Sequence, residues 1–119
     1  MDTAAVVFER PGQVTVRSLA LCAPGPADVV VETLASGVST GTEKMLFQGT
    51  MPAFPGMAYP LVPGYETVGR IVHAGPDSGH IVGSSVFVPG ANCYESAAGL
   101  FGATASRLVV PGSRVVELG

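Results

Sequence analysis

Glycine and proline interrupt this chain so often that no long helix is expected. The 119 residues include 16 glycines and 10 prolines. Glycine weakens a helix interior and proline breaks it, so the segments between them must be short. Short segments rich in Val, Ile, Thr and Phe that end at turn residues are typical of β-strands. The sequence therefore predicts one mainly β domain over residues 1–119, built as a small barrel or sandwich.

Several segments have this strand pattern. In residues 65–74, the clearest case, Val68, Arg70 and Val72 alternate with side chains of the opposite face. One short helix is expected at residues 40–48. The predicted strands are residues 3–8, 14–19, 28–34, 65–74, 85–88, 106–110 and 114–118.

Charge is scarce in this chain. Charged residues make up 13%, hydrophobic residues 47%, and the net charge is −3. Nucleic-acid binding needs a dense cationic patch, so we expect no nucleic-acid partner. No apolar run is long enough for a membrane span, and no signal-peptide pattern follows Met1, so a cytoplasmic location is expected. So little charge predicts a surface covered by another domain or an apolar ligand, with self-association of the isolated chain as a further possibility.

An apolar, proline-rich stretch occupies residues 45–63. Prolines at this density exclude a regular strand, and methionine side chains adapt to irregular surfaces. Two interpretations stay open: the stretch closes the core of the barrel, or it forms one wall of a pocket for a broad, flat, apolar ligand. The second interpretation makes these residues substrate-binding candidates: Met45, Phe47, Met51, Phe54, Met57 and Tyr59.

Two motifs carry a family resemblance. The run Gly-Val-Ser-Thr-Gly-Thr-Glu-Lys (residues 37–44) precedes Pro-Gly-Tyr-Glu-Thr-Val-Gly (residues 63–69). Together they resemble the catalytic half of the medium-chain dehydrogenase/reductase superfamily. The resemblance implies a GroES-like, partly open β-barrel with one or two short helices. It also implies a partner nucleotide-binding Rossmann domain that is absent from this chain, which has no Gly-x-Gly-x-x-Gly motif.

Other blocks resemble the members of this superfamily that act in bacteriochlorophyll synthesis. They are residues 39–44, 51–57, 59–66 and 86–91. This resemblance implies oxidation of the 3-(1-hydroxyethyl) group of a tetrapyrrole to acetyl, with NAD bound by the missing domain. A zinc-free quinone or enoyl reductase, and a non-catalytic module that binds an apolar ligand or a partner protein, remain alternatives.

The positions that bind zinc in the metal-dependent members are changed here. The resemblance places Ser39 where those members have a Cys ligand and Tyr65 where they have a His ligand. The four-Cys lobe of a structural zinc is also absent, since the chain has only two cysteines. We therefore expect no zinc, and chemistry performed by hydroxyl, phenol, ammonium and carboxylate groups.

The catalytic candidates lie in and after the two motifs. Hydroxyl groups in residues 39–42 could relay a proton or donate to a substrate oxygen, although Ser and Thr also cap helices. Lys44 could stabilise negative charge or be a solvated helix residue, and Glu66 could be a base or an ion-pair partner. Cys93, in a loop that could approach the site, is a further substrate-binding candidate. The catalytic candidates are Ser39, Thr40, Thr42, Lys44, Tyr65 and Glu66.

Overall fold

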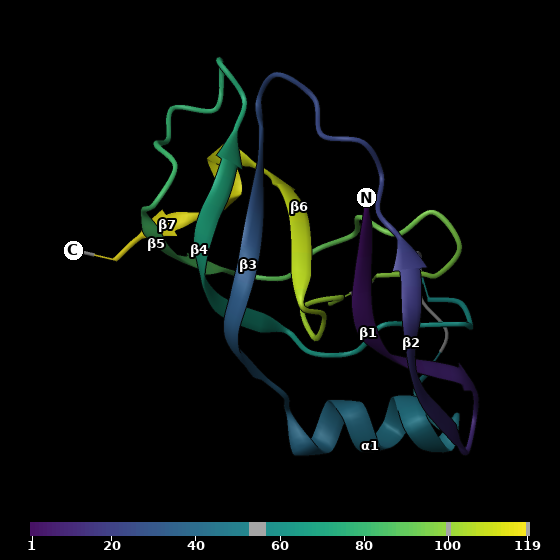
Figure 1. Cartoon of the computed structure of the whole chain (residues 1–119). Helices are drawn as coiled ribbons and strands as arrows, with labels where there is room; N and C mark the ends of the chain where they lie inside the picture. Colours follow the sequence, from purple (N-terminus) through teal and green to yellow (C-terminus); the bar gives the residue numbers. More distant parts are fainter. Residues whose placement is uncertain (53–56, 100, 119) are drawn as a thin grey trace.

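Two antiparallel sheets form the molecule, seen side by side in Figure 1. The computed structural model describes residues 1–52, 57–99 and 101–118. Strands β1 (Asp2–Arg10) and β2 (Gln13–Ala20) form a hairpin, and the other sheet has the order β6-β3-β4-β5-β7. Its strands are β3 (Asp28–Gly37), β4 (Glu66–Ala74), β5 (Ser85–Val88), β6 (Arg107–Pro111) and β7 (Val116–Glu117).

The two sheets meet along β1. Isolated bridges pair Ala5 with Ala105 and Phe8 with Leu61, and the Ser106 N–H donates to Ala4 O at 2.8 Å. These contacts leave the sheets incompletely joined, which confirms the prediction of a mainly β, partly open barrel.

The predicted elements agree with the structure except at some ends. Helix α1 (Thr40–Gln48) has the predicted bounds, and β4 has the predicted alternation, with Val68 and Val72 on its exposed face. The predicted strand at residues 114–118 is wrong at both ends. A 3₁₀ turn, η1 (Gly112–Arg114), takes up its start, because the Val115 N–H donates back to Gly112 O. Only the two residues of β7 then pair with β5.

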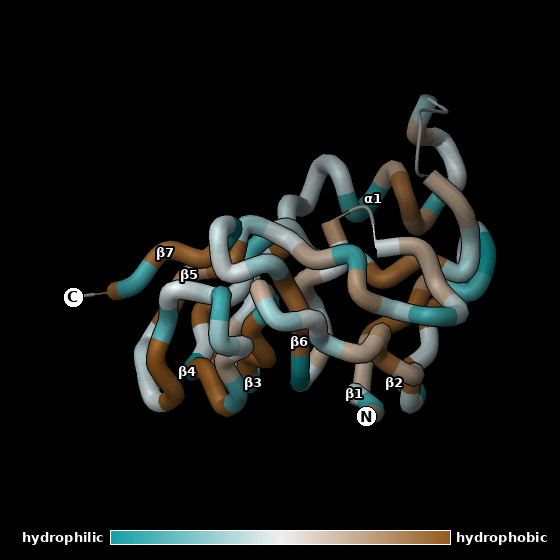
Figure 2. The backbone as a smooth tube through the Cα atoms, turned by 90° about the horizontal axis from the view of Figure 1, so that it is seen from above, coloured by the Kyte–Doolittle hydropathy of each residue, from teal (hydrophilic) through white to brown (hydrophobic). Residues whose placement is uncertain are grey.

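The main hydrophobic core lies between the sheets. Val29, Val30 and Val31 are all at most 1% exposed, so the first half of β3 is covered on both faces. Figure 2 shows hydrophobic stretches along β3, β4 and β7. Burying each such side chain stabilises the fold by about 1.5–3 kcal/mol.

A second, smaller cluster positions α1 at the turn end of the hairpin (Figure 1). It consists of Phe8, Leu46 and Leu61, of which Leu46 comes from the helix. The Gly12 N–H in the hairpin turn also donates to Phe47 O at 2.6 Å. No helix among the described residues is long and apolar enough to cross a membrane.

Candidate active site

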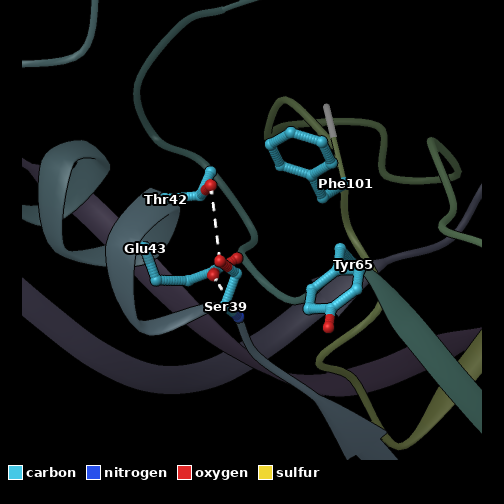
Figure 3. Close-up of a pocket in the computed structure, with 5 residues that line it drawn as sticks. All are labelled: Ser39, Thr42, Glu43, Tyr65 and Phe101. Atoms are coloured by element: carbon cyan, nitrogen blue, oxygen red, sulfur yellow. Dashed lines mark hydrogen bonds between the residues drawn. The ribbon is translucent and has the colours of Figure 1, made fainter.

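A cavity of about 320 Å³ opens where the start of α1 faces the chain before β4. Figure 3 shows the rings of Tyr65 and Phe101 across from three side chains of the helix start. The cavity thus draws on three segments that are far apart in the sequence. Its lining residues are Ser39, Thr42, Glu43, Tyr65 and Phe101.

Glu43 holds two of these segments together. Its carboxylate is buried; Oε2 accepts the Ser39 N–H at 2.6 Å and Oε1 accepts the Gly64 N–H at 3.1 Å. Hydrogen bonds to a charged acceptor are about twice as strong as neutral ones. One carboxylate therefore fixes the start of α1 against the loop that carries Tyr65.

The Ser39 hydroxyl does not bond to the helix backbone and lies at the cavity. Ser39 is the N-cap residue of α1, but its side chain makes no capping hydrogen bond. Instead its hydroxyl donates to Thr42 Oγ1 at 3.5 Å, a long contact (Figure 3). The capping interpretation of Ser39 is therefore wrong, and its hydroxyl and that of Thr42 both line the cavity.

The backbone before β4 places Tyr65 at the cavity. Its N–H donates to Gly37 O at 3.1 Å, and its side chain is 42% exposed. Gly64 has a φ of +88°, and a Cβ on it would lie 1.9 Å from Thr104 Oγ1. The sequence predicted that the strand begins at Tyr65, but β4 begins at Glu66. Tyr65 still belongs to the turn, because the preceding Gly64 adopts the left-handed conformation that glycine permits.

Glu66 lies beside a different cavity. It pairs with Gly37 at the end of β3, so close that a Cβ on that glycine would be 2.6 Å from Glu66 Oε1. Its carboxylate lines a cavity of about 240 Å³ together with Val68 and Phe87. Of the six catalytic candidates, Ser39, Thr42 and Tyr65 line the first cavity, and Glu66 lines the second.

Thr40 and Lys44 are exposed on α1 and are not among the residues that line either cavity. Sequence reasoning missed Glu43 and Phe101, which do line the first one. Glu43 had a local signal, an acidic residue one helical turn after Ser39. Phe101 had none, since only the fold brings it to the cavity.

The apolar stretch packs mainly onto the smaller cluster. Phe47 contacts Phe8 edge to face, with ring centroids 5.7 Å apart, and the Tyr59 hydroxyl donates to Leu46 O. Met51 and Met57 pack against the same cluster, whereas Met45 is 37% exposed and Phe54 lies outside the described residues. This packing favours the interpretation in which the stretch closes the core. Phe101, which was not among the candidates, packs against the same cluster and also lines the cavity.

Cys93 is placed in the main core and does not line the cavity. Its side chain is 2% exposed, and burial raises the pKa of its thiol. A hydrogen bond from the Val109 backbone opposes that shift without cancelling it. Contact between this thiol and a ligand in the cavity therefore has no support from its position.

The residues at the cavity do not fit a zinc site. Zinc in proteins takes thiolate, imidazole or carboxylate ligands in a tetrahedral arrangement. The cavity offers two hydroxyls, a phenol and a carboxylate whose two oxygens already accept backbone N–H groups. Among the residues that the structure describes, no group of three or more His, Cys, Asp or Glu could hold a metal ion.

Comparison with known families decides which family this is. Residues 25–119 match the alcohol dehydrogenase GroES-like domain. The chain belongs to this family. The resemblance found in the sequence motifs is therefore confirmed at the level of the GroES-like domain.

Two relatives of this GroES-like chain bear the same name, 2-desacetyl-2-hydroxyethyl bacteriochlorophyllide A dehydrogenase. The protein from Rhodobacter capsulatus is 50% identical over 119 residues, and the one from Cereibacter sphaeroides is 49% identical over 123 residues. Each alignment covers 99% of this chain but only 38% and 39% of the relatives. The crystal structure of D-arabinose dehydrogenase from Sulfolobus solfataricus shares the fold, with a TM-score of 0.78 at 17% identity, over 100% of this chain and 41% of that one.

Proposed function

We propose that this GroES-like chain is the substrate-binding and catalytic part of an NAD-dependent dehydrogenase. Its reaction is the oxidation of the 3-(1-hydroxyethyl) group of a bacteriochlorophyllide precursor to acetyl, without zinc. The observation that carries the proposal is the cavity where the hydroxyls of Ser39 and Thr42 lie across from the rings of Tyr65 and Phe101, at the two motifs that carry the family resemblance. The names of the two relatives, which are about half identical to this chain, support the substrate class.

The cavity residues suit the chemistry of alcohol oxidation. The alcohol must lose its O–H proton as a hydride leaves the carbon, so groups that stabilise a partial alkoxide speed the reaction. A well-placed donor of this kind contributes about 3 kcal/mol of transition-state stabilisation. In the proposed mechanism, Ser39 hydrogen-bonds to the substrate oxygen and takes its proton while passing its own to Thr42, from which a proton leaves to water at the mouth of the cavity. Tyr65 donates to the substrate oxygen from the opposite side.

The hydride acceptor belongs to a part of the protein outside this chain. NAD supplies a nicotinamide ring that takes the hydride. The chain spans 38% and 39% of the length of its two relatives, and the remainder is proposed to provide a Rossmann domain. The role of this chain's residues is to bind the alcohol and hold it for transfer.

The size of the cavity fits the reacting end of the substrate. At about 320 Å³ it is at the lower end of small-molecule pockets. It would enclose the hydroxyethyl arm and the ring edge next to it. Phe101 then packs against the macrocycle, held from behind by the smaller cluster.

A titration with a hydroxyethyl-bearing chlorin tests the substrate class directly. We expect saturable changes in chlorin absorption and fluorescence, and weaker binding for Phe101→Ala. Phe87→Ala is the matched control, since Phe87 is equally half-buried but lines the neighbouring cavity. Absence of saturable binding, or equal losses in the two variants, would refute the proposed binding site.

Activity and metal content test the rest of the proposal. In the whole protein, Ser39→Ala and Thr42→Ala should each lower kcat by about 10²-fold, the effect of losing one such donor. A metal assay should give much less than one zinc per chain. One firmly held zinc per chain would contradict the zinc-free mechanism, and an unchanged kcat in both variants would remove the hydroxyls from it.

A further inference from the structure

The two cysteines of the chain, which are 71 positions apart in the sequence, are neighbours in the fold. An antiparallel bridge pairs Leu21, just after β2, with Tyr94 in the loop after β5. In that register the next pair outward is Cys22 with Cys93. The Cys22 N–H donates to Cys93 O at 2.8 Å, one of the two hydrogen bonds that close this bridge, so Cys22 and Cys93 lie next to each other across it.

The spacing expected for neighbouring residues of an antiparallel pair suits a disulfide. Opposed residues in a hydrogen-bonded antiparallel pair have Cα atoms about 5.5 Å apart, and a disulfide requires about 4.4–6.8 Å. Opposed residues also direct their side chains to the same face of the ladder. We expect a bond between the two sulfurs to need side-chain rotation, in which the Cys93 thiol gives up its hydrogen bond with the Val109 backbone, and little rearrangement of the backbone.

We propose that Cys22 and Cys93 form an intramolecular disulfide when the protein meets a hydroperoxide. The Cys22 thiolate attacks the peroxide, the O–O bond breaks, and a sulfenic acid and an alcohol or water result. The Cys93 sulfur then attacks Cys22 Sγ, the S–O bond breaks, and water leaves with the Cys93 proton. In sum, two thiols are oxidised to one disulfide and one peroxide is reduced.

The different surroundings of the two thiols set the order of these steps. Cys22 is exposed, whereas Cys93 is buried in the main core. Burial raises the pKa of the Cys93 thiol, and the neighbouring Cys22 raises it further. Thiolate character and access control peroxide reactivity, so Cys22 is the thiol that is oxidised and Cys93 the one that resolves it.

The crosslink would act on the loop that lines the cavity. The Ala91 N–H donates to Phe101 O at 2.8 Å, and the buried Tyr94 hydroxyl donates to Gly102 O. Cys93 thus lies in a loop whose two arms are bonded together, and Phe101 is in the second arm. A disulfide to Cys22 fastens this loop to the end of the hairpin, on the opposite sheet.

The test compares the reduced chain with the chain treated with hydrogen peroxide and then desalted. We expect the intact mass to fall by about 2 Da as two thiol hydrogens are lost, both cysteines to resist alkylation, and a linked peptide pair after digestion. The melting temperature should rise by about 5–15 °C, because the crosslink closes a long loop of the unfolded chain. Dithiothreitol should reverse every change.

Cys22→Ser and Cys93→Ala are the controls, and the exposed position of Cys22 keeps its variant informative even if Cys93→Ala does not fold. Cys22→Ser should show neither the mass loss nor the temperature shift. Three results would overturn the proposal: disulfide-linked dimers in place of the internal bond, Cys22 advancing to sulfinic acid while Cys93 remains free to alkylate, or a temperature shift that persists in Cys22→Ser.

Discussion

Replacing Glu43 by alanine should loosen the start of α1 from the loop before β4. The wild-type carboxylate accepts the Ser39 N–H at 2.6 Å and the Gly64 N–H at 3.1 Å. A hydrogen bond to a charged group contributes about 1.5–3 kcal/mol, which sets an upper range of about 3–6 kcal/mol for the two. The two donors differ in what can replace the lost acceptor.

Ser39 lies at the cavity, so water can replace the carboxylate there, whereas Gly64 is buried and its N–H stays unpaired. An unpaired buried donor costs about 1–3 kcal/mol. With the loss of one charge-assisted bond at Ser39 partly offset by water, we expect Glu43→Ala to lower the free energy of unfolding by about 3 kcal/mol. Domains have a free energy of unfolding of about 0.05–0.15 kcal/mol per residue, so a chain of this length still folds after that loss.

Urea denaturation followed by circular dichroism measures the change, and the melting temperature should fall by about 12 °C. Glu43→Gln keeps the shape but offers one acceptor oxygen, so it should lose about half as much. Lys44→Ala, on the exposed side of the same helix turn, is the matched control and should stay within about 0.5 kcal/mol of wild type. If Glu43→Ala loses less than about 1 kcal/mol, or Glu43→Gln is as stable as wild type, the carboxylate does not join the two segments.

Two further outcomes follow from the geometry. Gly64→Ala should destabilise the chain by about 2 kcal/mol or more in the same assay, because alanine disfavours a φ of +88° and its Cβ would clash with Thr104. If the variant is as stable as wild type, the left-handed turn at Gly64 is not required. Arg17→Ala should raise the pKa of Glu9 toward its ordinary value, since hydrogen bonds from Arg17 and then Thr15 hold it low. The lowered pKa means that the ion pair stabilises the fold above the unfolded-state pKa and that this effect is lost as pH falls through the folded-state pKa. An NMR pH titration of the Glu9 carboxyl carbon checks this, and the same pKa in both proteins would refute it.

Local patterns in the sequence were sufficient for most of the elements. Alternation in residues 65–74 identified β4 and separated its two faces, because a strand directs successive side chains to opposite sides. Helix α1 was predicted with its observed bounds. Its end is set locally, because Gly49 takes a left-handed φ of +74° there. The end of the chain was harder, since η1 and the short β7 depend on contacts with β5 that no local pattern encodes.

The candidate site was predicted in part for a similar reason. Ser39 and Thr42 are three positions apart at the start of a helix, so their proximity follows from helix geometry. Tyr65 could be placed beside them only through the resemblance. Glu66 was predicted to belong to the same site. The strand register instead pairs it with Gly37, and it lines the neighbouring cavity.

The sequence alone determined a short-stranded, mainly β chain with one helix and a family motif, because these depend on neighbouring residues and on backbone preferences. Only the tertiary structure decided which side chains share a cavity and which two thiols are opposed. Phe101 lines a cavity with Ser39, 62 positions earlier, and Cys93 lies next to Cys22, 71 positions earlier, because the sheets bring these loops together. Such pairings are set by how the sheets bury their apolar faces together, a property of the whole chain that no single segment carries.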